Sequence, residues 1–190
     1  GRAFINALLK AADRGVRVRL LLDDIFTSGY DAGMAALDSH PNFEIRIFNP
    51  FNRGAAGKAW SGLTNLGRIN RRMHTKTFTV DNQVTIVGGR NLADEYYLTG
   101  GEAEFIDEDL LAIGPPVDEI SDGFDEYWNS PEAIPMDAFD RLVAHSHVDE
   151  SLDEARRLLS RHEDKPFLSN ADGGLIDRFL DGRLDLVAAR

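Results

Sequence analysis

The sequence predicts an α/β protein in which a mixed β-sheet is flanked by helices, with a helical, acidic extension at its C-terminal end. Segments with apolar residues at helical spacing alternate with short strand-like runs, which is typical of a sheet covered by helices. The chain has 190 residues, of which 43% are hydrophobic, enough for a sizeable core. It holds no apolar run of the roughly 18 residues that a membrane-spanning helix needs.

The chain begins with a helix–strand pair. Phe4, Leu8 and Ala12 recur at helical spacing and predict a helix over residues 2–14. The run over residues 16–22 predicts a strand, which the pair Asp23-Asp24 closes. A strand-end turn is the simplest role for these two aspartates, although α/β proteins often place functional groups at such ends.

The same alternation continues to about residue 130. The tripeptide Asp81-Asn82-Gln83 predicts a tight turn between two strands, and the glycines and short polar residues of 49–62 predict a loop. We therefore expect helices at 31–39 and 117–129, and strands at 43–48, 75–80, 84–87 and 109–113.

The character of the chain changes after Pro131, where acidic helical segments follow. We expect a catalytic half over residues 1–133, and over 134–190 a helical linker with the start of a second, truncated half. The chain starts without methionine inside a helical pattern, so we expect it to be part of a longer protein. The elements expected in the second part are helices at 137–145, 151–162 and 172–180 and a strand at 184–188.

Charge is distributed unevenly along the chain. The net charge is −11, yet residues 51–92 carry seven basic side chains and one acidic side chain. A local positive field in an acidic protein suits an anionic group such as a phosphodiester. The overall acidity argues against a long nucleic-acid footprint, so nucleic acid is not the expected partner. Arg68, Arg71 and Arg72 belong to this basic stretch and either form a solvated helix face or meet anionic lipid headgroups.

The residues with the clearest chemistry also lie in the basic segment. His74 and Lys76 are two positions apart, and in a strand such residues point to the same face. An imidazole can attack phosphorus as a nucleophile, and an ammonium can neutralise the phosphate under attack. We expect His74 to form a phosphohistidine intermediate and Lys76 to bind a phosphate oxygen.

Four residues that follow Lys76 in the sequence are further candidates for the site. Asp81 is a catalytic candidate together with His74 and Lys76, but its place at a strand end favours a structural role over direct catalytic contact. Gly88 and Gly89 remove side chains where backbone passes close to the site, and the amide of Asn91 can bind the same phosphate.

The pattern His-x-Lys-x4-Asp-x6-Gly-Gly-x-Asn, which begins at His74, resembles the signature of the phospholipase D superfamily, called HKD after its three reactive residue types. Four other segments resemble the bacterial cardiolipin synthases, and more narrowly their C-type branch. The resemblance implies a phospholipase D-like half that transfers a phosphatidyl group to phosphatidylglycerol, with phosphatidylethanolamine as the expected donor. It also implies peripheral attachment to the cytoplasmic side of the bacterial inner membrane. The four segments are 15–24, 46–51, 70–74 and 124–130.

The pattern occurs once, whereas enzymes of this superfamily use two copies. The other histidines are His40, His145, His147 and His162, and none is followed by lysine two residues later. The expected site therefore needs a second HKD half in cis or a homodimer. Two alternatives remain open: a phosphodiesterase or nuclease with water as acceptor, and a non-catalytic phosphate-binding domain.

Neither a cofactor nor a metal ion is expected. The chain has no cysteine, so thiolate metal sites are excluded. His145 and His147 with nearby Asp149 could ligate a metal, but a solvated acidic helix is the preferred interpretation because no further ligand set is evident.

Overall fold

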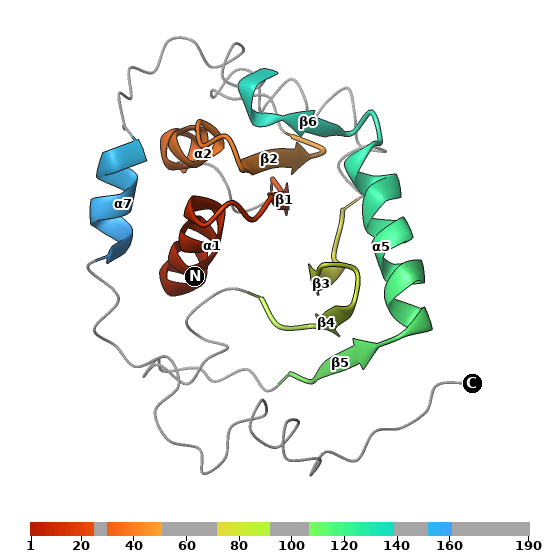
Figure 1. The fold of residues 1–190 in the computed structure, drawn as a ribbon. Coiled ribbons are helices and arrows are strands. Elements are labelled where there is room, and N and C mark those ends of the chain that lie inside the picture. The colour runs from red at the N-terminus through yellow and green to blue at the C-terminus, as the bar shows by residue number, and fades with distance from the viewer. Residues whose placement is uncertain (25–29, 51–71, 92–106, 139–151, 161–190) are drawn as a thin grey trace, which may run out of the picture.

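The structure is a computed structural model, and it describes residues 1–24, 30–50, 72–91, 107–138 and 152–160 (Figure 1). In this part of the chain, helices alternate with strands, and the strands form two small sheets. This arrangement confirms the α/β class. Helices with bounds inside the described residues include α1 (Arg2–Asp13), α2 (Asp31–Asp38), α5 (Pro115–Trp128) and α7 (Leu152–Ser160).

The first sheet is mixed and has the order β1-β2-β6. Strands β1 (Val18–Asp23) and β2 (Phe43–Phe48) pair in parallel, with α2 in the connection between them. A parallel pair needs such a crossover because the chain must return to the same end of the sheet. Strand β6 (Ala133–Pro135) pairs antiparallel with β2 and forms an edge.

The second sheet is antiparallel and has the order β3-β4-β5. Strands β3 (Lys76–Val80) and β4 (Val84–Gly88) form a hairpin, and β5 (Asp109–Ile113) pairs with β4. The turn of the hairpin lies at Asp81 and Asn82, both with φ of 52°, a left-handed conformation that Asp and Asn tolerate better than most residues.

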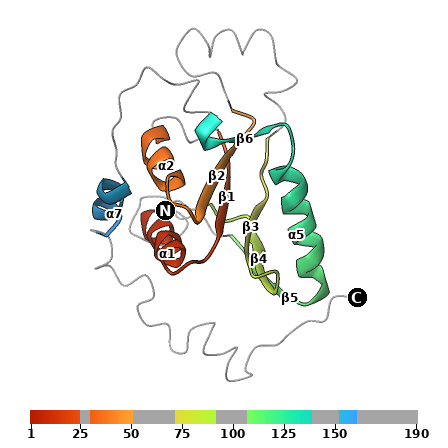
Figure 2. The ribbon, with the colours of Figure 1, turned by 45° about the horizontal axis from the view of Figure 1, so that its top comes forward.

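The strands lie between two layers of helices. Figure 2 shows α1 and α2 on one side of β1 and β2, and α5 on the other side. Alternation along β2 explains this layering, because Phe43, Ile45 and Ile47 are buried in the core against α1 and α2, while Glu44 and Arg46 point the other way. Helix α7 packs outside α1 and α2.

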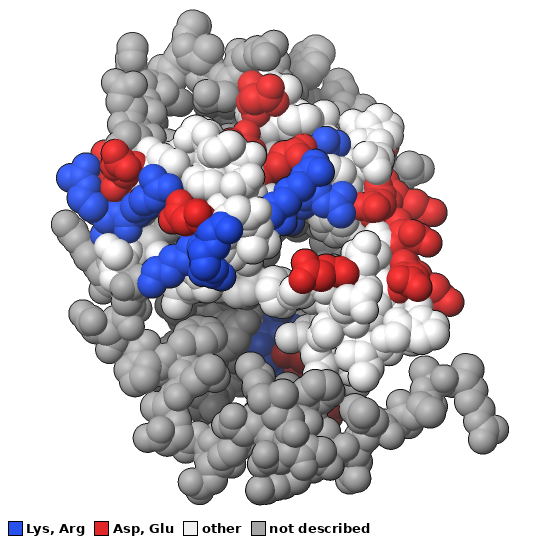
Figure 3. All heavy atoms as spheres, viewed as in Figure 1, with Lys and Arg blue, Asp and Glu red and all other residues white. Residues whose placement is uncertain are grey.

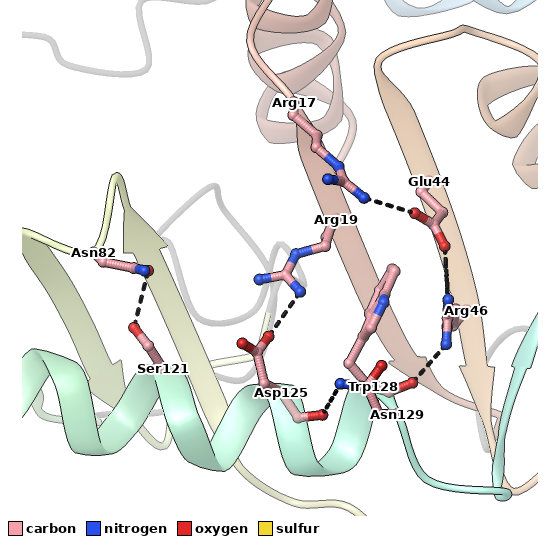
Figure 4. Close-up of polar contacts among 9 residues, drawn as sticks. All are labelled: Arg17, Arg19, Glu44, Arg46, Asn82, Ser121, Asp125, Trp128 and Asn129. Carbon is pink, nitrogen blue, oxygen red and sulfur yellow. Dashed lines mark hydrogen bonds and ion pairs between the residues drawn. The ribbon is translucent and has the colours of Figure 1, made fainter.

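Helix α5 is fixed to both sheets by polar contacts (Figure 4). Arg19 of β1 donates to Asp125 at 2.7 Å, and Arg46 of β2 donates to the carbonyl oxygen of Trp128 at 2.8 Å. The Arg46 guanidinium also lies 4.5 Å from the centre of the Trp128 ring, a cation–π distance. At the other sheet, Ser121 donates to the side chain of Asn82 in the β3–β4 turn. Helix α5 therefore links the two sheets.

Most predicted elements are confirmed, with shifts of one to two residues at their ends. Strand β1 starts at Val18 rather than at residue 16, because the backbone N–H of Val16 still bonds to Ala11 of α1. Strand β6 was not predicted, and it includes the expected domain boundary between residues 133 and 134. Met136 lies in the core of the first half, so the chain beyond that boundary also contributes to this core.

Some predicted elements lie outside the described residues. They are the loop over 49–62 from residue 51 onward, most of the helix over 137–145, the helix over 172–180 and the strand over 184–188. The division into two domains stays a prediction.

Candidate active site

The candidate site lies where the carboxyl end of β1 meets the segment that enters β3. Asp23 is the last residue of β1 and accepts two hydrogen bonds from this segment. Its Oδ2 atom accepts the backbone N–H of Met73 at 3.0 Å, and its Oδ1 atom accepts from the Arg72 guanidinium at 3.2 Å. These bonds fix the chain directly before His74.

His74 is exposed and precedes β3 by two residues. His74 and Lys76 were expected to share one face of a strand, but only Lys76 belongs to the strand. The reason lies in the pairing of β3: Lys76 pairs with Gly88, the last residue of β4, so the ladder ends before it reaches His74. His74 and Lys76 are nevertheless neighbours, for another reason.

Lys76 folds back toward His74. Its Nζ atom donates a hydrogen bond to the carbonyl oxygen of His74 at 2.9 Å. Partial burial lowers the pKa of the Lys76 ammonium below its usual value, while the carboxylates of Asp107 and Asp23 oppose this shift. The ammonium is thus held beside the backbone of His74, where it interacts electrostatically with Asp107 and Asp23.

The two glycines make room for acidic side chains. A Cβ atom at Gly88 would overlap the carboxylate of Asp109 and lie 2.9 Å from the carbonyl oxygen of Glu108, and one at Gly89 would overlap the carboxylate of Asp107. The sequence suggested that glycine lets backbone approach the site. The structure shows that the space is filled by Asp107 and Asp109 from the segment that leads into β5.

Arg90 holds the same two aspartates in place. Its Nη2 atom donates to the carbonyl oxygen of Asp107 at 2.8 Å, and its Nε atom lies 3.2 Å from the Asp109 carboxylate. Asn91 follows directly and is partly buried. Gly88, Gly89 and Arg90 thus accommodate Asp107 and Asp109, and of these two carboxylates Asp107 interacts electrostatically with Lys76.

Asp81 lies at the opposite end of β3 from His74. Five residues of strand separate the two, roughly 16 Å at about 3.3 Å per residue. Asp81 is exposed in the hairpin turn, whose backbone is closed by a 3.0 Å bond from the Gln83 N–H to the Val80 carbonyl oxygen. This placement supports the structural role that was preferred for Asp81.

His40, the other histidine in the described residues, has a structural position. It is buried, its Nδ1 atom accepts the backbone N–H of Asn42 at 3.1 Å, and its Nε2 atom lies 3.2 Å from the Asp13 carboxylate. Both ring nitrogens are therefore occupied within the fold. The metal alternative at His145 and His147 lies outside the described residues.

Charges of both signs lie on the surface of the described residues. On the face shown in Figure 3, basic side chains lie in one group over α1 and α7 and in a second group over β1 and β2, and acidic side chains gather over α5. Arg72, expected on a solvated face or at lipid headgroups, is instead largely buried, with 16% of its side chain exposed, and pairs with Asp23. Arg68 and Arg71 lie outside the described residues.

Sequence reasoning missed Asp23, Arg72 and Arg90 as parts of the site. Asp23 was seen as a strand-end turn, but its carboxylate binds residues 49 and 50 positions later. The usable signal was its position at the carboxyl end of a buried strand, where α/β proteins gather functional side chains. For Arg72 and Arg90, no comparable feature of the sequence indicated which residues they would bind.

Comparison with known proteins identifies the family. Residues 1–128 match the family described as "Cardiolipin synthase, PLD-like domain". The chain is 42% identical to cardiolipin synthase C of Escherichia coli strain K12, in an alignment that covers 100% of this chain and 40% of that protein. It is 33% identical to a cardiolipin synthase of Staphylococcus aureus strain Mu50, over 68% of this chain and 25% of that protein.

The chain therefore belongs to the cardiolipin synthase branch of the phospholipase D-like proteins. It spans two-fifths or less of the length of these relatives. An uncharacterized protein of Helicobacter pylori strain 26695 is 35% identical over 90% of the chain. No solved structure gives a significant match. Among the described residues, no helix is both long and apolar enough to span a bilayer.

Proposed function

We propose that this chain supplies one half of the active site of a cardiolipin synthase-type phosphatidyltransferase. The observation that carries the proposal is the bond from Lys76 Nζ to the His74 carbonyl oxygen, which holds an ammonium beside an exposed histidine. Membership of the cardiolipin synthase family supports a phospholipid as the substrate.

In the proposed first step, His74 attacks the phosphorus of a donor phospholipid such as phosphatidylethanolamine. An N–P bond forms, the P–O bond to the headgroup alcohol breaks, and an acid protonates the departing oxygen. Lys76 stabilises the charge on the non-bridging oxygens, and the amide of Asn91 donates to the same phosphate. Gly88 and Gly89 contribute by leaving space for the carboxylates of Asp109 and Asp107.

In the second step, a hydroxyl of phosphatidylglycerol attacks the phosphohistidine, and the N–P bond breaks. The acceptor's proton goes to the group that acted as acid, which has now become the base. We assign this group to a second HKD half, supplied in cis or by a homodimer partner, since His74 is occupied as nucleophile. No metal ion or cofactor takes part in this scheme.

The acceptor decides the product, so a lipid assay tests the proposal. The intact protein is incubated with vesicles of phosphatidylethanolamine and phosphatidylglycerol, with the donor labelled in its phosphatidyl group. We expect a labelled lipid that contains two phosphatidyl groups. Labelled phosphatidic acid as the sole product would contradict transfer and indicate hydrolysis.

We also propose that the protein acts as a peripheral protein on the cytoplasmic side of the bacterial inner membrane, where such lipids are available. The pairing of Arg72 with Asp23 removes that arginine from the headgroup contacts expected of the basic stretch. Flotation with vesicles of the same two lipids tests attachment, and a protein that stays at the bottom of the gradient would contradict it.

The pH dependence follows from the environment of Lys76. Its pKa is lowered from the usual 10.5 by burial, so it loses its proton at a lower pH than a free lysine. The protonated form of Lys76 stabilises the phosphate, so turnover should fall as rising pH removes this proton. The fall should begin at a pH at which a free lysine is still protonated. Lys76→Arg, whose guanidinium stays protonated, should turn over more slowly but move this decline to higher pH. Identical alkaline limbs in the two pH–rate profiles would exclude Lys76 as their cause.

A further inference from the structure

The segment before His74 is tied to the ends of both parallel strands. Asp23, at the end of β1, binds the Met73 N–H and the Arg72 guanidinium. The same Arg72 donates to the carbonyl oxygen of Asn49, directly after β2, at 3.3 Å. A carboxylate at the end of β1 and a backbone carbonyl oxygen directly after β2 thus meet at one arginine, two residues before the candidate nucleophile.

The Asp23–Arg72 pair is shielded from water. Only 15% of the Asp23 side chain and 16% of the Arg72 side chain are exposed. An exposed ion pair contributes little to stability, whereas a pair largely removed from water leaves an uncompensated charge when one partner is lost. Asp23 also uses both carboxylate oxygens, one for each donor, which fixes its orientation.

We propose that Asp23 is a positioning residue for the transfer reaction, an inference that rests on the proposed function. Asp23 acts through a chain of three links, two hydrogen bonds and one peptide bond. It fixes the backbone of Met73, Met73 is joined to His74, and the His74 carbonyl oxygen receives the Lys76 ammonium. Asp23 touches neither the substrate nor the reacting atoms, and it sets where the imidazole and the ammonium stand relative to the sheet.

The direct test replaces Asp23 by Asn in the intact protein. Asn keeps the size of the side chain, but it offers the Met73 N–H a weaker, neutral acceptor and removes the charge that holds Arg72. We expect kcat to fall about 10- to 100-fold, as small misplacements of reacting groups do, with KM within about threefold. The matched control is Asp125→Asn, which removes another aspartate–arginine pair, with Arg19 at 2.7 Å, and should leave kcat unchanged.

A double-mutant cycle with Arg72→Ala separates positioning from general weakening of the fold. If Asp23 and Arg72 position the segment before His74 as one unit, the double variant should lose at most about threefold more than the worse single variant, since coupled residues are not additive. Fully multiplied losses, or a kcat of Asp23→Asn within twofold of the unchanged protein, would overturn the inference. The inference would also be overturned if Asp23→Asn lost activity only because part of the protein was unfolded, while kcat per folded molecule stayed normal.

Hydrogen exchange at the Met73 amide provides a readout that does not depend on activity. Asp23→Asn should accelerate exchange at Met73 and leave the amides of β2 unchanged. Unchanged exchange at Met73 would overturn the inference even if activity fell. If the unaltered protein transfers no phosphatidyl group, the proposed function fails, whereas a change in activity confined to Arg72→Ala defeats only the role of Asp23.

Discussion

Replacing His74 by Ala in the intact protein is expected to lower phosphatidyl transfer by about 10⁴-fold or more, the scale seen when a catalytic nucleophile is removed. The other histidine among the described residues, His40, cannot take over the N–P bond, because it is buried and both of its ring nitrogens are occupied within the fold. Transfer is measured with the labelled donor lipid, at protein concentrations high enough to detect residual product.

The fold should survive this substitution. His74 is exposed, and surface replacements usually change the free energy of unfolding by less than about 0.5 kcal/mol. The control is His162→Ala, a histidine outside the motif to which the mechanism gives no role. Undiminished turnover of His74→Ala would leave only a phosphate-binding function for this site.

Replacing Gly88 by Ala should destabilise the second sheet and the site together. A Cβ atom there would lie 2.8 Å from the Cγ atom of Asp109 and 2.9 Å from a backbone oxygen, closer than real contacts allow. Either β5 or the Asp109 side chain must move, and the Arg90–Asp109 pair must move with it. We expect the free energy of unfolding to drop by about 1–3 kcal/mol, the usual range for overpacking.

The same substitution at Gly123 provides a matched control. Gly123 lies inside α5, and a Cβ atom there meets nothing within 4 Å. Ala is the better helix former by about 0.5–1 kcal/mol, so Gly123→Ala should be neutral or stabilising. Urea unfolding of both variants measures the difference. Equal effects at the two glycines would show that Gly88 is not needed to accommodate Asp109.

Local sequence patterns predicted most of the described fold because burial follows them. The alternation of Phe43, Ile45 and Ile47 with polar residues gave β2 its bounds, and the same alternation is seen in its burial. Strand β6 escaped prediction because it has three residues and contains Pro135, and such a segment qualifies as a strand only through its edge pairing with β2.

The sequence was sufficient to predict the candidate reactive residues, but not the contacts that hold these residues in position. Spacing indicated His74 and Lys76 as neighbours, yet they meet through a side-chain bond to a carbonyl oxygen rather than across a strand face. The contacts of Asp23 with Met73 and Arg72 connect residues about 50 positions apart, and charge pairs of that range leave no periodic signal.

The most direct test of the central claim, that His74 and Lys76 act on one phosphorus atom, is to trap the covalent intermediate. The intact protein is mixed with donor lipid labelled at phosphorus, quenched in alkali, digested and mapped by mass spectrometry. We predict an acid-labile phosphorus adduct on His74 that is lost in Lys76→Ala. Steady transfer with no adduct on His74, or with the adduct on another residue of this chain, would contradict the mechanism.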